Sequence, residues 1–268
     1  MSGDAEAAFG AVADELRVRI LRELWDAEGA LAFSELRERV DVRDSGRFNY
    51  HLGKLRGRFV EQTDDGYELR YAGQQLVSAL YSGVYTEDAS VGPSPVDGSC
   101  FDCGGDLEAR YEDEHGHVEC TDCGMNVVMG GVPPAFVDGR EDDLATAIDA
   151  YLRTQIRQCT AGFCPECSGP TTGRLAVSDY GPQAIFECGR CGGEFQGTAS
   201  MVALEHPAVV AFYREHGRDV REVPVWKLDW VAQPEWDGDE ARVTVAVDGD
   251  ELALTVDESL SVSGAERA

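Results

Sequence analysis

The sequence predicts an α+β protein, because helical and strand-like apolar patterns both occur along its 268 residues. A chain of this length corresponds to about two domains. Helical spacing dominates the first third, and four C-x2-C cysteine pairs, separated by segments that fit β-hairpins, follow it. Near the end, residues 243–247 and 252–256 alternate on either side of Asp248-Gly249, which is typical of a further hairpin.

The first third has the element order of a winged helix-turn-helix domain, which we place at residues 1–85. Apolar residues at helical spacing predict one helix over 9–24. Two shorter helices follow, and we expect Ser45 to cap the second of them. Residues 59–69 fit a hairpin with turn residues at its tip, and a last helix is expected over 72–85. Helices followed by a hairpin and a closing helix are typical of the winged module.

Eight of the nine cysteines form two sets of paired C-x2-C motifs. One set is Cys100, Cys103, Cys120 and Cys123, and the other is Cys164, Cys167, Cys188 and Cys191. Each pair can form a turn that presents two thiolates to one ion, and two such turns complete a tetrahedral site of four sulfur atoms. The sequence therefore predicts two zinc ribbons and two Zn²⁺ ions per chain. Four cysteines leave no open coordination position, so these sites are expected to be structural.

Redox dithiols and disulfides are two other uses of paired cysteines, and both are less favoured here. Redox dithiols would need the strand–helix context of a thioredoxin-like motif, which this sequence lacks. Disulfides would need an oxidising compartment. The ninth cysteine, Cys159, stands outside both sets, and a buried thiol is favoured there over a redox or alternative-ligand role.

The cysteine positions and the composition divide the rest of the chain. The polar stretch at 86–97 contains proline and glycine and predicts a linker. We expect a strand over 225–230 and a frayed tail after Asp257. The predicted units are a first zinc ribbon at 98–137, a connecting helix at 138–158, a second zinc ribbon at 159–199, and a helix plus C-terminal strands at 200–260.

The charge of the chain is strongly negative. Asp and Glu number 50 against 23 Lys and Arg, which gives a net charge of −27. Self-repulsion of this size is bearable where the Debye length falls to about 3 Å, as in molar salt. We interpret the composition as a halophilic surface, because apolar periodicity and aromatic residues argue against an acidic disordered chain.

The composition also bears on location and class. Every uncharged stretch, including the one at 124–137, is too short to span a bilayer, and the first ten residues lack the basic and apolar parts of a signal peptide. We therefore expect a cytoplasmic protein without a membrane role. The sequence has no P-loop, no dinucleotide-binding motif and no Ser/His/Asp arrangement at useful spacing, so it is not predicted to be an enzyme.

Residues 43–58 are the only positively charged cluster, with five basic residues and one acidic residue. Such a cluster is often a solvated face, but in a chain this acidic it favours an anionic partner. A winged helix that contacts protein alone is the competing interpretation. For double-stranded DNA, the predicted base-reading residues are Arg47, Asn49 and Tyr50. The residues predicted to contact phosphates are Arg43, Ser45, Lys54, Arg56 and Arg58.

The segments VADELRVRILREL, LAFSELRERV, SGRFNYHLGKL and RFVEQTDDGYEL resemble the ArsR-type winged-helix regulators of haloarchaea. The part with two ribbons resembles the C-terminal part of many of those proteins. The resemblance implies a homodimeric, sequence-specific transcriptional regulator. Metal-sensing members carry a cysteine pair on the first helix of the helix-turn-helix, where this chain has none, so metal sensing through that site is not implied.

A general transcription factor is the alternative function. A winged helix followed by a zinc ribbon also resembles the archaeal transcription factor E, which contacts the transcription machinery rather than a defined operator. The basic cluster at 43–58 argues against that alternative, and genome-wide occupancy would separate the two.

Overall fold

The computed structural model describes residues 2–267 and divides them into two compact units. The first unit comprises the chain through Asp88 together with Pro133–Phe136, and the second comprises Ala89–Val132 and the chain from Val137 onward. Eight α-helices and four antiparallel sheets occur within residues 2–267, so the fold is a mixture of α and β structure. No helix in this described part is long and apolar enough to cross a membrane.

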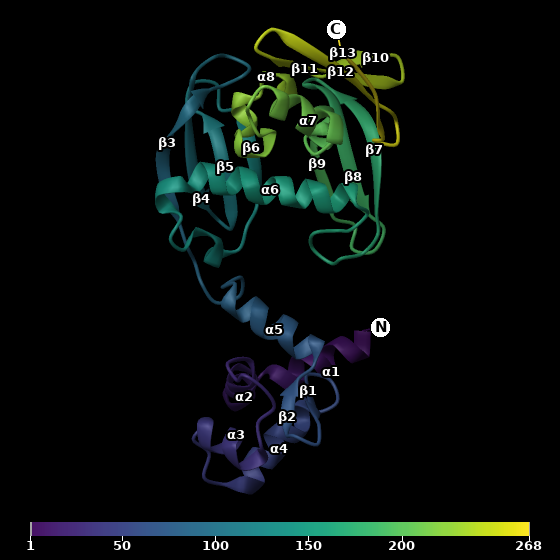
Figure 1. Cartoon of the computed structure of the whole chain (residues 1–268). Coiled ribbons are helices and arrows are strands. Elements are labelled where there is room, and N and C mark those ends of the chain that lie inside the picture. Colours follow the sequence, from purple (N-terminus) through teal and green to yellow (C-terminus); the bar gives the residue numbers. More distant parts are fainter. Residues whose placement is uncertain (1, 268) are drawn as a thin grey trace. The chain divides into compact units, whose positions relative to one another are not determined.

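The first unit consists of five helices and one two-stranded antiparallel sheet (Figure 1). The helices are α1 (Ser2–Val12), α2 (Glu15–Trp25), α3 (Phe33–Arg39), α4 (Ser45–Leu55) and α5 (Tyr71–Tyr81). The strands are β1 (Val60–Gln62) and β2 (Tyr67–Leu69). Leu31 adds a single antiparallel bridge to Tyr67 beside this sheet.

Helices α2 and α4 supply half of the buried core residues of the first unit. Phe48, Leu52 and Leu55 recur on one face of α4 and are completely buried. They belong to the same core as Ile20 and Leu21 of α2, which are also completely buried. Because side chains three and four residues apart share one face of a helix, the other positions of α4 face solvent, except for His51, which is half-buried beside Asp14.

The single helix predicted over 9–24 is in fact two helices, α1 and α2. The Asp14 side chain caps α2 by accepting hydrogen bonds from the backbone amides of Leu16 and Arg17, at 3.0 and 3.3 Å. A side chain that satisfies these amides begins a new helix and interrupts the preceding one. Phe9, which was expected in the core, is 70% exposed on α1. Helix α5 also ends before residue 85, because Gly83 adopts a left-handed φ of 77°.

The second unit contains three antiparallel sheets (Figure 1), with strand orders β3-β4-β5-β6, β7-β8-β9 and β10-β11-β12-β13. The strands of the first sheet are β3 (Val91–Ser99), β4 (Asp106–Glu112), β5 (His115–Cys120) and β6 (Asn126–Gly131). Those of the second are β7 (Thr171–Ser178), β8 (Gly181–Cys188) and β9 (Glu194–Thr198). Those of the third are β10 (Glu235–Asp237), β11 (Glu240–Val247), β12 (Asp250–Val256) and β13 (Val262–Arg267).

Helix α6 (Leu144–Thr160) lies along the first sheet and reaches the second (Figure 1). Its Ile148 and Leu152 side chains are buried against β5 and β6, where glycines leave room for them. A Cβ placed on Gly116 would come within 2.7 Å of Ile148, and one on Gly130 within 2.5 Å of Leu152. These two glycines therefore allow α6 to approach the sheet closely. The other helices are α7 (Pro207–Glu215), α8 (Asp229–Ala232) and the 3-10 helices η1 (Pro134–Val137), η2 (Glu141–Asp143), η3 (Ala199–Ala203), η4 (Val220–Glu222) and η5 (Val225–Lys227).

Three expectations for the second unit were wrong. The predicted linker at 86–97 contains most of β3, whose two prolines are tolerated because β3 is an edge strand. The predicted strand over 225–230 is η5 followed by α8, since the consecutive buried pairs 225–226 and 230–231 do not fit strand alternation. The tail after Asp257 forms β13, because the Asp257 carboxylate holds a turn by accepting from the amides of Ser259 and Ser261, both at 2.9 Å.

Candidate metal centres and a candidate nucleic-acid interface

The first cysteine set meets at one end of the sheet β3-β4-β5-β6. Cys100 and Cys103 lie in the turn between β3 and β4, and Cys120 and Cys123 lie where β5 turns toward β6. All four sulfur atoms lie within 4.8 Å of one another. The Sγ atoms of Cys100 and Cys123 are 3.8 Å apart, and those of Cys103 and Cys120 are 3.5 Å apart. A tetrahedron with Zn–S bonds of about 2.3 Å has edges of roughly 3.8 Å, so the spacing fits a bound metal ion.

The second set repeats this arrangement at one end of the sheet β7-β8-β9. Cys164 and Cys191 are 3.8 Å apart and Cys167 and Cys188 are 3.5 Å apart, the same two distances as in the first set. These sulfur atoms also lie within 4.8 Å of one another. The separations are far longer than the S–S bond of about 2.05 Å in a disulfide, and all nine cysteines are free.

Each pair is presented by a turn that the local sequence dictates. In the first turn the amide of Cys100 donates to Gly105 O and the amide of Gly104 donates to Cys100 O, both at 2.9 Å. Gly104 has a φ of 74°, a left-handed conformation that glycine adopts without strain. The equivalent turn at Cys164 uses Ser168, a non-glycine residue with a φ of 57°.

Backbone amides near the sulfur atoms favour the thiolate form. Hydrogen bonds from the amides of Cys191 and Arg190 lower the pKa of Cys188 to about 6. The amide of Cys123 chiefly lowers the pKa of Cys120, to about 7. At Cys103 and Cys167 the amides of Gly105 and Gly169 are outweighed by burial and the surrounding sulfur atoms, which raise the pKa of both thiols to about 12. Thiolates are the form that binds metal, so holding four of them this close together requires a cation to balance their charge. Two four-cysteine groups that could each hold a metal ion are therefore present, as the sequence predicted.

Cys159 lies outside both groups. It is buried near the end of α6, 2% exposed, and burial raises the pKa of its thiol to about 11. A thiol with so high a pKa stays protonated at neutral pH and is a weak nucleophile. This environment is that of a buried thiol, the interpretation that the sequence favoured.

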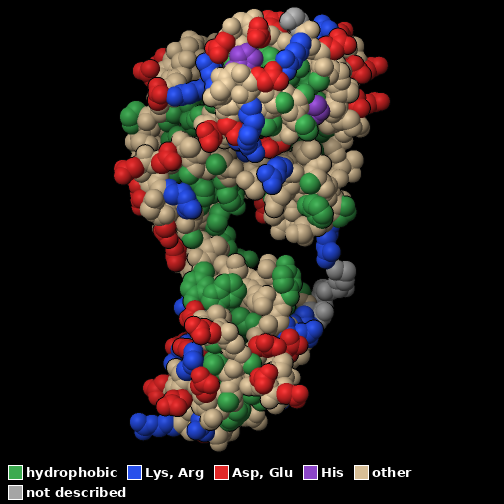
Figure 2. All heavy atoms as spheres, in the orientation of Figure 1, with side chains coloured by type: hydrophobic (Ala, Val, Ile, Leu, Met, Phe, Trp, Pro, Cys, Tyr) green, Lys and Arg blue, Asp and Glu red, His purple; other side chains and the backbone are tan. Residues whose placement is uncertain are grey.

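The predicted DNA-binding residues all lie on one stretch of the first unit, on α4 and the segments on either side of it. Each of them is exposed: Arg43, Ser45, Arg47, Asn49, Tyr50, Lys54, Arg56 and Arg58. Tyr50 is 59% exposed, and the Lys54 ammonium lies 5.4 Å from the centre of its ring. Figure 2 shows basic side chains on the part of the first unit that α3 and α4 occupy in Figure 1.

The beginning of α4 differs from the expectation. The cap is Asp44 rather than Ser45, and its carboxylate accepts from the amides of Gly46 and Arg47 at 2.8 and 3.0 Å. These hydrogen bonds lower the pKa of Asp44, so it is ionised at neutral pH. A carboxylate thus satisfies the amides that we had expected a phosphate to use, and Ser45 loses that role.

Arg70 was not predicted from the sequence as part of the basic surface. It lines a groove of about 560 Å³ with Arg56, Gly57, Arg58, Tyr71 and Ala72. Its guanidinium donates to Gly57 O, and its backbone amide donates to Phe59 O at 2.9 Å. Pairing of Val60 with Leu69 brings the two ends of the hairpin together, so the predicted hairpin itself was the signal that could have found this arginine. The tip of the same hairpin carries exposed Asp64 and Asp65.

Two known families match most of the chain. Residues 97–262 match the family described as Domain of unknown function (DUF7351). The chain belongs to this family. The DUF7351 region contains both four-cysteine groups, α6, α7 and most of the third sheet. Residues 5–80 match a second family, described as Domain of unknown function (DUF7347), which contains all the exposed basic residues around α4. No curated protein and no solved structure matches the chain.

Proposed function

We propose that the first unit is a winged helix-turn-helix DNA-binding domain and that the protein is a sequence-specific transcriptional regulator, not an enzyme. In this proposal α3 and α4 form the helix-turn-helix, and the β1–β2 hairpin is the wing. The observation that carries the proposal is the exposed basic face of α4 in a chain whose net charge is −27. Positive charge gathered on one helix face of an otherwise acidic protein favours a polyanionic partner.

The exposed residues divide by their chemistry. Arg47 and Asn49 can make bidentate contacts with guanine and adenine in the major groove, and Tyr50 lies beside them on α4. Residues at or beyond the two ends of α4 are suited to phosphates, which set register without reading sequence. This second group is Arg43, Lys54, Arg56, Arg58 and Arg70.

The hairpin in this proposal acts through its base rather than its tip. Asp64 and Asp65 would be repelled by phosphates, whereas Arg56, Arg58 and Arg70 surround the groove at the opposite end of the hairpin. We therefore propose that the DNA backbone follows this groove.

We propose that the two four-cysteine groups hold two structural Zn²⁺ ions per chain. A zinc ion would join two turns that are otherwise linked only through the strands between them, which stabilises sheets with small cores. Metal analysis of protein purified without added zinc should give two equivalents. One equivalent or none would contradict the proposal.

The resemblance to ArsR-type regulators supports a homodimer in the cytoplasm. Leu76, Val77, Leu80 and Val84 of the segment 72–85 exceed the apolar residues that so small a domain needs for its own packing, which suits a dimer contact, but Val77 is completely buried within the first unit. Tyr81 and Tyr85 are 47% and 74% exposed and are better placed for contact with a second chain. Light scattering in molar KCl should give the mass of two chains.

Genome-wide occupancy of the tagged protein tests the function. A regulator should occupy a limited set of sites, and Arg47→Ala should abolish occupancy there. The matched control is Arg19→Ala, which removes the same charge from an exposed position of α2. Occupancy at most promoters, unchanged by Arg47→Ala, would instead favour a general factor that contacts the transcription machinery.

A further inference from the structure

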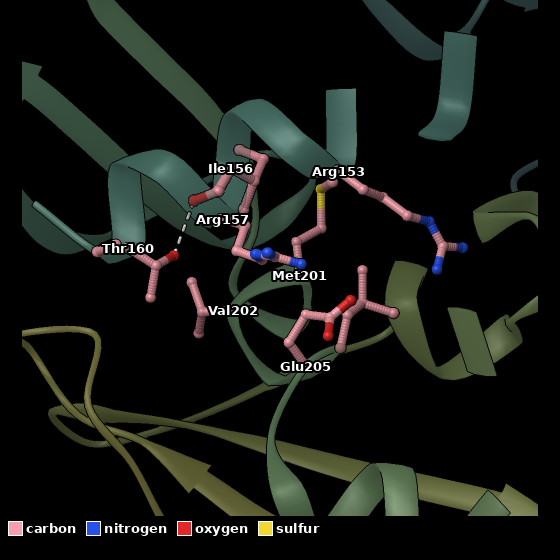
Figure 3. A pocket seen from close by; sticks show the side chains of 9 residues that line it. Arg153, Ile156, Arg157, Thr160, Met201, Val202 and Glu205 are labelled. Atoms are coloured by element: carbon pink, nitrogen blue, oxygen red, sulfur yellow. Dashed lines mark hydrogen bonds between the residues drawn. The ribbon is translucent and has the colours of Figure 1, made fainter. Parts of the chain in front are cut away.

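The second unit contains a cavity of about 230 Å³ between α6 and the segment that follows β9 (Figure 3). One helical face of α6 supplies Arg153, Ile156, Arg157 and Thr160. The facing wall is formed by Met201, Val202, Leu204 and Glu205. Cavities for drug-sized ligands measure about 300–1,000 Å³, so an occupant of this one is a smaller molecule.

Arg153 belongs to the wall of this cavity. Its Nε atom lies 2.9 Å from the carboxylate of Asp149, and its two other nitrogens donate to the carbonyl oxygens of Val220 and Val223. Thr160 is engaged in the same way, because its hydroxyl donates to Ile156 O at 2.9 Å. Neither side chain has its main donors free for a ligand.

Arg157 and Glu205 differ from those two residues. Within residues 2–267 the structure records no hydrogen bond or ion pair for either charged group, although both line the same cavity. Glu205 contributes to the raised pKa of Arg221, but that guanidinium already lies 2.6 Å from the Asp219 carboxylate. In Figure 3 the guanidinium of Arg157 and the carboxylate of Glu205 both extend into the space between α6 and η3. Both residues are exposed to solvent. One positive and one negative group thus line the cavity without forming an ion pair with each other.

Residues 86–268 hold 35 acidic and 12 basic residues, and six arginines there form ion pairs. Arg110, for example, lies 3.0 Å from Glu119, and Arg218 lies 2.9 Å from Asp248. Within the described residues no ion pair is recorded for Arg157, Arg174, Arg190 or Arg242, and Arg157 is the one of these four that lines the cavity. A guanidinium and a carboxylate that line one cavity without an ion pair between them suit a ligand that carries both charges.

We propose that this cavity binds a free α-amino acid with an apolar side chain of moderate size. The α-carboxylate would pair with the Arg157 guanidinium, whose planar fork suits a carboxylate, and the α-ammonium would pair with Glu205. The side chain of the amino acid would lie against Ile156, Met201 and Leu204. A dicarboxylate or a phosphate is disfavoured by Glu205, and an amine without a carboxylate by Arg157.

The binding test uses the full-length, metal-loaded protein in molar KCl and isothermal titration calorimetry. L-leucine is the probe, and two analogues of the same size each lack one charge: 4-methylpentanoate lacks the ammonium and isoamylamine lacks the carboxylate. We expect L-leucine to bind and each analogue to bind at least about tenfold more weakly, because one charge-assisted pair is lost.

Variants locate the site. Arg157→Gln and Glu205→Gln should each weaken L-leucine binding by about tenfold or more. Arg174→Gln, at an exposed position of β7 in the same unit, removes the same charge as Arg157→Gln and should leave binding unchanged. Circular dichroism and metal content confirm that each variant is folded.

Three results would overturn the proposal. L-leucine, L-methionine and L-valine could all fail to bind at millimolar concentration. 4-Methylpentanoate could bind as tightly as L-leucine, which would make the cavity an anion site. L-leucine binding could also survive Arg157→Gln in folded protein. None of these results depends on whether the first unit binds DNA.

Discussion

The two units of the chain bury their apolar side chains in different ways. In the first unit, helices pack around one continuous core that includes Ile20, Phe48 and Leu52. The second unit divides its residues among three small sheets, and two of these carry a four-cysteine group at one end. Amphipathic helices of this length can bury enough area against one another, whereas small sheets have thin cores. The difference explains why every paired cysteine is in the second unit.

The two regions also differ in charge. Residues 1–85 carry a net charge of −4 and residues 86–268 carry −23. The basic residues that bring the net charge of the first region close to zero, such as Arg47 and Lys54, are exposed around α4. In the other region, arginines mostly form ion pairs with the surrounding carboxylates, as Arg221 does with Asp219 at 2.6 Å. Positive charge is thus exposed around one helix in the first region and mostly paired with carboxylates in the other.

Removal of metal should have the largest effect of all, because it should unfold much of the second unit and leave the first unit folded. A chelator should unfold the two sheets that carry cysteines and leave the first unit folded, because structural zinc contributes about 10–16 kcal/mol in isolated zinc-finger peptides. Hydrogen exchange followed by mass spectrometry should show loss of protection in β4, β5, β7 and β8, with α2 and α4 still protected.

Single cysteine variants are the controls for this experiment. Cys188→Ser should remove one of the two metal ions, and Cys159→Ser should leave both bound because Cys159 is buried outside the four-cysteine groups. Equal loss of protection in both units on chelation would show that the first unit also depends on metal.

A truncation in the helical core should have the next largest effect. Leu52→Ala removes a completely buried side chain and should lower the free energy of unfolding of the first unit by about 2–5 kcal/mol. Urea denaturation in molar KCl measures this, and metal content should remain at two equivalents. A loss near the surface value of about 0.5 kcal/mol would mean that the core can relax around the cavity.

A smaller effect is expected from neutralising one exposed lysine. Lys54→Gln should weaken binding to all DNA sequences equally and reduce the slope of log K against log salt by about 0.9, because one phosphate contact is lost. The matched control is Arg190→Gln, at an exposed position of the second unit. Fluorescence anisotropy over a range of KCl concentrations gives the slopes. A sequence-dependent loss for Lys54→Gln would move that residue to the base-reading group.

The smallest expected effect is a pH dependence in the second unit. The Nδ1 atom of His216 lies 2.8 Å from Phe212 O and its Nε2 atom lies 3.1 Å from the Asp250 carboxylate. The hydrogen bond to Phe212 O and the interaction with Asp250 raise the pKa of His216 above its usual 6.5. A raised pKa stabilises the folded state below the usual value, and the contribution disappears as pH rises through the raised value.

Thermal unfolding of His216→Gln tests this effect. The wild-type protein should melt at a higher temperature than the variant below pH 6.5, and the difference should shrink as the pH increases. A difference that does not change with pH would assign the contribution of His216 to packing against Phe212, whose ring centre is 4.8 Å away.

The features that could be predicted from sequence depend on residues near one another in the chain. The C-x2-C pairs predicted both metal groups, because the turn that presents each pair is closed by hydrogen bonds within six residues. The apolar spacing of Phe48, Leu52 and Leu55 predicted which face of α4 is buried, because a helix repeats every 3.6 residues. Asp14 is a capping residue that could have divided the helix predicted over 9–24, but that helix was predicted from apolar spacing alone.

Other features depend on contacts between distant segments. β3 is a strand because β4 accepts it at the edge of a sheet, although its own sequence resembles a linker. Residues 225–231 are helical because both Val225-Trp226 and Trp230-Val231 are buried, and Trp226 donates to Asp97 O from 129 positions away at 3.1 Å. No local pattern reports such a partner.

The sequence by itself determined the α+β class, the eight metal-ligand candidates, the buried face of α4 and the acidic surface. Each of these follows from composition or from the fixed repeat of a helix or a turn. Only the tertiary structure decided that Arg70 joins Arg56 and Arg58, and that Arg157 and Glu205 share one cavity. Arg157 and Glu205 share this cavity because α6, which Gly116 and Gly130 allow to approach the first sheet closely, also contacts η3 in the segment after β9.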